Sequence, residues 1–80
     1  MIPYGNAGKD SNVQGYELGE GSIRVAFTDG SQYLYTDAST GPAKVERMRA
    51  LAVKGHGLNG YISRHVGEAY AERRRPEEEG

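Results

Sequence analysis

Six residues between two expected helices form the most recognisable chemical motif of the chain. Gly55-His56-Gly57-Leu58-Asn59-Gly60 matches the pattern G-x-G-x-x-G, which binds the pyrophosphate of dinucleotides when it lies between a strand and a helix. Here the segment joins two helices, so we reject that function and interpret the segment as a glycine-rich turn. A reduced alternative is an anion held at the start of the second helix by His56, Gly57 and Asn59.

The side chains that usually carry catalysis do not form a convincing site. The chain has no cysteine and two histidines, His56 and His65, which excludes thiolate chemistry and disulfides and leaves too few ligands for the usual zinc site. Glu68 and Glu72 are four residues apart, as expected of solvated charges on one helix surface. We therefore predict that the protein is not an enzyme and that it uses no metal and no cofactor.

Tyr33 and Tyr35 are the strongest candidates for a binding surface. They are two positions apart in an expected strand, so they share one of its faces. With a two-residue turn at Asp29-Gly30, both tyrosines lie beside Arg24 on the face opposite Phe27, as an aromatic and cationic platform able to stack bases. A three-residue turn shifts the register by one and puts both tyrosines in the core with Phe27. The sequence leaves both registers open.

Charge is distributed unevenly, although the net charge is only −1. Residues 1–42 carry a net −3, residues 43–75 a net +5, and the glutamates at 77–79 a further −3. Such asymmetry occurs in proteins that bind nucleic acids or anionic partners, and also on ordinary solvated helices. Arg73-Arg74-Arg75 complements a helix dipole and is close to the acidic run, so we interpret it as a solvated helix end. The cations expected to contact phosphates or a partner are Lys44, Arg47, Arg49, Lys54 and Arg64.

The first half of the chain has the pattern of strands. Residues 22–28 alternate in polarity, which is typical of a half-buried strand. Further strands are expected at 13–18 and 31–36, the second of which contains the good strand formers Tyr33, Leu34 and Tyr35. Asp29-Gly30 is a favoured hairpin signal between the last two strands.

The second half has the pattern of helices. A helix is expected from Pro42, which suits the first helical position, to the terminating Gly55. A second helix is expected from about Asn59, a good N-cap, to about Arg74. Gly67 would then lie inside this helix at a cost of roughly 1 kcal/mol against alanine, which suggests close packing there.

This order of elements predicts an α+β fold, β-β-β-α-α, in which a three-stranded antiparallel meander is followed by two helices packed on one face. We expect a single domain over residues 11–75, a loose arm over 1–10 and a disordered acidic tail over 76–80. No stretch approaches the ~20 apolar residues of a membrane span, and the start of the chain has no secretory signal. We therefore expect a cytoplasmic protein that does not bind membranes.

Several of these positions together resemble the KTSC domain, a family named after a C-terminal extension of some lysyl-tRNA synthetases. The family also occurs as small stand-alone bacterial and phage proteins. The resemblance covers residues 10–70 and implies a poorly characterised domain for which RNA binding has been suggested from the synthetase context. The chain departs from the family where Asp37-Ala38-Ser39 precedes Pro42, and where Leu58 replaces the usual aromatic residue. The matching positions are Ser11-Asn12-Val13, Gly15-Tyr16, Ile23-x-Val25-x-Phe27, Gly30, Tyr33-x-Tyr35, Gly57-x-Asn59 and Ile62.

Two functions from different classes follow from these patterns. The first is a nucleic-acid-binding module, for RNA in particular, with Tyr33, Tyr35 and Arg24 stacking bases and the basic helices contacting phosphates. The second is a protein-interaction module, such as an accessory or inhibitor protein of bacterial or phage origin that docks on a larger complex. Its acidic and basic halves suit electrostatic docking. Association into a homo-oligomer would extend the small core.

Overall fold

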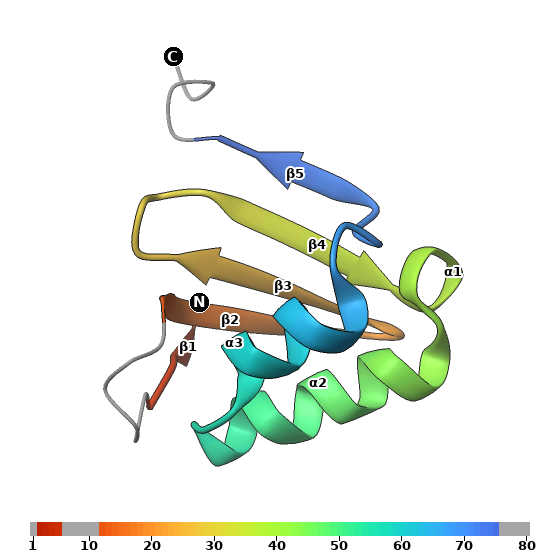
Figure 1. Cartoon of the computed structure of the whole chain (residues 1–80), viewed down its shortest axis with the longest axis horizontal. Helices are drawn as coiled ribbons and strands as arrows, with labels where there is room; N and C mark the ends of the chain where they lie inside the picture. Colours follow the sequence, from red (N-terminus) through yellow and green to blue (C-terminus); the bar gives the residue numbers. More distant parts are fainter. Residues whose placement is uncertain (1, 6–11, 76–80) are drawn as a thin grey trace.

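Five antiparallel strands form one sheet whose spatial order, β1-β2-β3-β4-β5, is the order of the chain. The computed structural model describes residues 2–5 and 12–75. The helices cover one face of the sheet (Figure 1). This confirms the α+β class, with a meander that is longer by one strand at each edge than predicted. The elements are β1 (Ile2–Pro3), β2 (Val13–Gly19), β3 (Ser22–Phe27), β4 (Gln32–Thr36), α1 (Asp37–Thr40), α2 (Pro42–Lys54), α3 (Leu58–Tyr61), the π-helix η1 (Ile62–Val66) and β5 (Glu72–Arg74).

The hairpin between β3 and β4 has the longer of the two turns considered. The Phe27 amide donates to the Ser31 carbonyl over 2.9 Å, which leaves three residues, 28–30, in the loop. Gly30 has a φ of 91°, the left-handed conformation that such a loop needs at its last position. The resulting register pairs Val25 with Tyr33, so the tyrosines lie on the face that the helices cover. The alternative that placed them on the opposite face is therefore wrong.

Helix α2 has the predicted position and packs its apolar side on the sheet. Pro42 is in its first turn, and Gly55 ends it with a φ of 78° while its amide donates to the Leu51 carbonyl over 2.9 Å. Val45 and Met48 are 1% and 0% exposed. Within the described part of the chain, no helix has the length and apolar character needed to cross a membrane.

The second predicted helix is wrong in its C-terminal half. The helical segment ends at Val66, and Gly67 follows with a φ of 58° and a ψ of −122°. The chain then reverses and forms β5, in which Arg73 pairs with Tyr33 of β4. Tyr70 is four positions after Val66, a spacing that suits one helix face, but its ring packs on Tyr33 and Tyr35 of β4. Arg73 and Arg74 are therefore strand residues and do not end a helix.

The N-terminal segment is partly integrated into the fold. Ile2 and Pro3 pair with β2, and Tyr4 is 7% exposed. The Leu58 amide, at the start of α3, donates to the Tyr4 hydroxyl over 3.1 Å. The expected loose arm therefore does not describe residues 2–5. Residues 6–10 of that arm and the acidic tail over 76–80 lie outside the described residues.

We expect Tyr4→Phe to lower the free energy of unfolding by about 1–3 kcal/mol, because it leaves the buried amide of Leu58 without its acceptor. Tyr16→Phe is the matched control, since Tyr16 is 6% exposed and its hydroxyl bonds to no other described residue. Its effect should stay within about 0.5 kcal/mol. Urea denaturation measures both changes, and equal losses in the two variants would contradict a role for this hydrogen bond.

Candidate ligand-binding pocket

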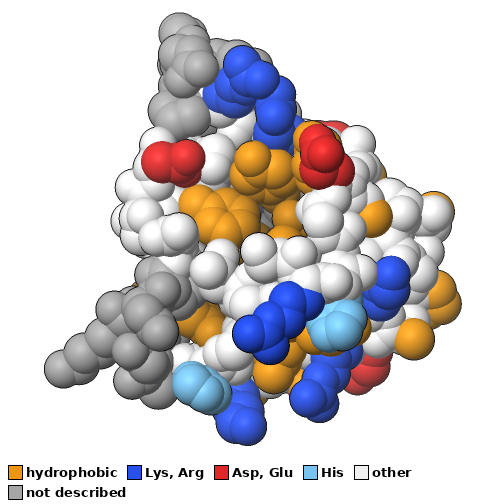
Figure 2. Space-filling model, viewed as in Figure 1, with side chains coloured by type: hydrophobic (Ala, Val, Ile, Leu, Met, Phe, Trp, Pro, Cys, Tyr) orange, Lys and Arg blue, Asp and Glu red, His pale blue; other side chains and the backbone are white. Residues whose placement is uncertain are grey.

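A pocket of about 600 Å³ lies between the β3–β4 hairpin and the helical segment that begins at α3. This volume is within the range of small-molecule and cofactor sites. The sheet contributes Phe27, Tyr33 and Tyr35, and the helices contribute Asn59, Ile62 and Ser63. In the space-filling view, hydrophobic side chains gather in a hollow on this face, with acidic and basic side chains around it (Figure 2).

One wall of the pocket is a network of four aromatic rings. The Tyr33 ring is central: it meets Phe27 edge-on with ring centroids 5.3 Å apart, and Tyr70 in the same manner at 4.9 Å. The rings of Tyr33 and Tyr35 are nearly parallel, 13° apart, at 6.3 Å. Edge-to-face contacts of this kind hold rings in defined positions. The wall is therefore a preformed aromatic surface.

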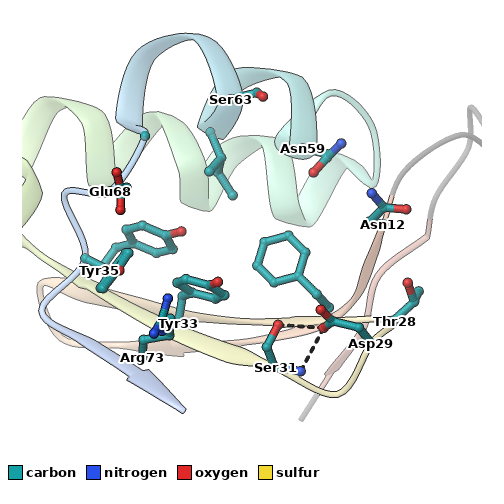
Figure 3. Close-up of a pocket in the computed structure, with 14 residues that line it drawn as sticks. Asn12, Thr28, Asp29, Ser31, Tyr33, Tyr35, Asn59, Ser63, Glu68 and Arg73 are labelled. Carbon is teal, nitrogen blue, oxygen red and sulfur yellow. Dashed lines mark hydrogen bonds between the residues drawn. The ribbon is translucent and has the colours of Figure 1, made fainter. Parts of the chain in front are cut away.

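Polar side chains at one end of the pocket have hydrogen-bonding capacity that the fold does not use. Asn12 and Asn59 lie near each other at that end, and Ser63 lies on the helical side (Figure 3). Among the residues that the structure describes, none bonds to these three side chains. Two carboxamides and a hydroxyl provide both donors and acceptors. A ligand with polar edges could therefore be oriented at this end.

Three charged residues line the pocket, in two different situations. The Asp29 carboxylate accepts hydrogen bonds from the Ser31 hydroxyl over 2.6 Å and from the Ser31 amide over 2.9 Å. These two bonds hold the pKa of Asp29 below its usual value, and the bond from the Ser31 hydroxyl has the larger effect. Glu68 and Arg73 are exposed at the other end, near the tyrosines (Figure 3), and neither has an ion pair or a hydrogen bond with a described residue. Their charges are free for a ligand.

Tyr35 lies deepest in the aromatic wall, with 1% of its surface exposed. Burial, followed by the proximity of Tyr33 and Tyr70, raises the pKa of Tyr35 above its ordinary value. Its hydroxyl therefore stays protonated and can donate a hydrogen bond. No buried side-chain nitrogen or oxygen within the described ranges lacks a partner.

The predicted site residues divide between the two faces of the sheet. Tyr33, Tyr35 and Asn59 line the pocket. Arg24 pairs with Glu17 on one side and with Leu34 on the other, so it lies on the sheet face away from the helices. The predicted platform of two tyrosines and Arg24 is therefore not formed.

The predicted basic residues are spread over the helices. Lys44, Arg47 and Lys54 are exposed on α2, and Arg64 is exposed on η1. Arg49 has a structural contact, because its guanidinium donates to the carbonyls of Gly19 and Ser22 in the β2–β3 turn. This contact fastens the turn to α2 and makes Arg49 the least accessible of the five.

The fold uses part of the backbone of the glycine-rich turn, since the His56 amide donates to the Leu51 carbonyl over 3.4 Å, and the anion site expected there stays a prediction. His56 and Gly57 are exposed, and Gly57 has a φ of 86°. The Leu58 amide that follows is occupied by Tyr4. α3 has only four residues, which makes its dipole small. The turn therefore places Leu58 in the core and Asn59 in the pocket.

Sequence reasoning missed most of the pocket lining, including the aromatic and charged residues Phe27, Glu68, Tyr70 and Arg73. Phe27 was assigned to the core, and the other three were assigned to the second helix. The available signal was Gly67, whose presence inside an expected helix indicated a chain reversal as well as close packing. Within residues 2–5 and 12–75, no three histidine, aspartate or glutamate side chains are grouped so as to hold a metal ion.

Comparisons with protein-family models, curated proteins and solved structures found no match to this chain. The resemblance to the KTSC domain stays a prediction. The geometry of the pocket and the chemistry of its lining are therefore the basis for a function.

Proposed function

We propose that this chain is a non-enzymatic binding module for single-stranded RNA, and that one base of the RNA enters the pocket. The observation that carries the proposal is the aromatic wall of Tyr33, Tyr35, Tyr70 and Phe27, beside polar side chains to which no described residue bonds. Unstacked bases are typically bound by aromatic rings and by hydrogen bonds to their edges. Duplex RNA does not offer such a base, so single strands are the expected ligand.

Few cations flank the pocket, which limits the contribution of phosphate contacts. Arg64 follows the pocket residue Ser63 on η1, and Arg75 follows β5. With two or three phosphate contacts at most, the logarithm of the affinity should fall with the logarithm of salt concentration with a slope of only about −1 to −2. Affinity would then depend on the base in the pocket more than on charge.

Replacement of Tyr33 by alanine is expected to weaken binding of a fluorescein-labelled single-stranded RNA by about 5- to 150-fold. This corresponds to the loss of about 1–3 kcal/mol of base stacking. Fluorescence anisotropy at low salt measures the affinity, and circular dichroism checks that the variant is folded. Arg24→Ala is the control, because Arg24 lies on the opposite face of the sheet. Absence of binding by the natural chain, or an equal loss in both variants, would overturn the proposal.

A protein-interaction module is the second candidate, favoured by the edge strand β5. All three of its residues are exposed, and Glu72 and Arg73 pair with Leu34 and Tyr33 of β4. An extended segment of a partner could add to such an edge through backbone hydrogen bonds. In the simplest form of this candidate function, the partner is a second copy of the chain. Analytical ultracentrifugation over a range of protein concentrations tests this form, and a strictly monomeric chain would exclude self-association.

A further inference from the structure

We infer that the pocket selects guanine among the bases of RNA. The inference rests on the proposed function, because it assumes that a base enters the pocket. It starts from the two charged side chains that line one end without a partner among the described residues, Glu68 and Arg73. Figure 3 shows both at the end of the pocket where Tyr33 and Tyr35 lie.

The Glu68 carboxylate sets the first requirement on the base. An ionised carboxylate accepts hydrogen bonds and donates none. Its two oxygens are best satisfied by two adjacent donors, and guanine offers these at N1 and at the exocyclic N2. Adenine, cytosine and uracil present a donor beside an acceptor on the corresponding edge, so an acceptor would face one carboxylate oxygen. Glu68 therefore favours guanine.

The Arg73 guanidinium sets the second requirement. Arg73 pairs with Tyr33 across β4 and β5, so its side chain leaves the sheet on the face of the aromatic wall. A guanidinium is a rigid fork of donors without an acceptor. It needs two adjacent acceptors, and guanine offers O6 and N7 on the edge next to the one that faces a carboxylate. One base therefore satisfies both charged groups with different edges.

The net charge of the residues that line the pocket is compatible with a neutral base and disfavours other ligands. The carboxylate of Asp29 is bonded to Ser31, so the charges of Asp29, Glu68 and Arg73 give a net −1. A phosphate inside the pocket would be repelled by the two carboxylates. A cationic side chain of a protein partner would suit the aromatic rings and Glu68 but would be opposed by Arg73. A neutral base with both donors and acceptors avoids both conflicts.

The test uses the whole chain and three labelled heptanucleotides, uridine runs with guanosine, adenosine or cytidine at the centre, with heptauridine as the reference. We expect the guanosine oligomer to bind about 5- to 150-fold more tightly than the others, the discrimination typical of a bidentate contact. Glu68→Gln should remove this preference while binding of the other oligomers persists, because an amide offers one donor and one acceptor. Arg73→Lys should reduce it.

Glu72→Gln is the matched control, because Glu72 is an exposed glutamate of the same segment that pairs with Leu34 on the other face of the sheet. It should keep the preference for guanosine. Equal binding of all four oligomers would overturn the guanine inference and leave RNA binding in place. Failure to bind any of them would overturn both. Loss of the preference in Glu72→Gln would also contradict the inference.

Discussion

Met48→Ala is expected to lower the free energy of unfolding by about 2–5 kcal/mol, which is a large part of the stability of a domain this small. Met48 is 0% exposed and belongs to the buried face of α2 that packs on the sheet. Truncation removes three heavy atoms from a core that has few side chains to rearrange into the space. Thermal or urea denaturation measures the change.

Two valines of the same helix provide a matched comparison. Val45 is 1% exposed and Val53 is 68% exposed, so Val45→Ala and Val53→Ala are the same chemical change at a buried and at a solvated position. We expect a loss of about 2 kcal/mol for Val45→Ala and a change within about 0.5 kcal/mol for Val53→Ala. Comparable losses at both positions would mean that α2 does not pack on the sheet by this face.

Gly67→Ala is expected to destabilise the protein by about 1–3 kcal/mol and to weaken the proposed RNA binding along with it. Gly67 has a φ of 58° and a ψ of −122°, a conformation that a residue with a Cβ atom adopts only under strain. The strain comes from the backbone itself, because no atom lies within 4 Å of the position of an added Cβ. The reversal at Gly67 leads into the segment that carries Glu68 and Tyr70, so the pocket depends on it.

Gly60→Ala should have the opposite sign. Gly60 lies inside α3 without a positive φ, and an added Cβ atom would also meet nothing within 4 Å. Alanine is the better helix former, so we expect a gain of about 0.5–1 kcal/mol. The urea denaturation midpoints of Gly60→Ala and Gly67→Ala measure the two changes in stability. A gain at both positions would show that the helix continues through Gly67 and that β5 does not form.

The local sequence pattern was sufficient to predict those elements whose structure depends mainly on their own residues. The alternation of Ile23 and Val25 indicated β3, and Pro42 and Gly55 marked the ends of α2. In these segments, periodicity and end signals agree with the packing that the fold requires. The α+β class follows from such elements alone.

Prediction from the local sequence pattern failed where contacts between residues distant in the sequence determine the structure. Asp29-Gly30 suits a two-residue and a three-residue turn alike, and the observed register is the one that buries Tyr35 between the sheet and the helices. Tyr70 is spaced from Val66 as on a helix, yet it packs on Tyr33, which is 37 positions earlier in the chain.

The pocket could be predicted from the sequence even less well than the fold. Its lining comes from four separate segments, at residues 12, 27–35, 59–63 and 67–73. Each segment is unremarkable alone, and only the hairpin register and the reversal at Gly67 bring them together. Glu68 and Arg73, on which the guanine inference rests, were both expected on the second helix, but the helical segment ends at Val66, before either of them.

The bond between Tyr4 and Leu58 also bears on the order in which the protein folds. Strands β2, β3 and β4 follow one another through short turns, so this part of the sheet can form at a small entropic cost, whereas β5 joins it only after the helical segments. The Tyr4 bond spans 54 residues and closes the longest loop among the side-chain hydrogen bonds of the described residues. Because of this separation in sequence, we expect the contact to form after the transition state for folding. Its loss would leave the refolding rate nearly unchanged and speed up unfolding, so that Tyr4 governs the lifetime of the native state more than its formation.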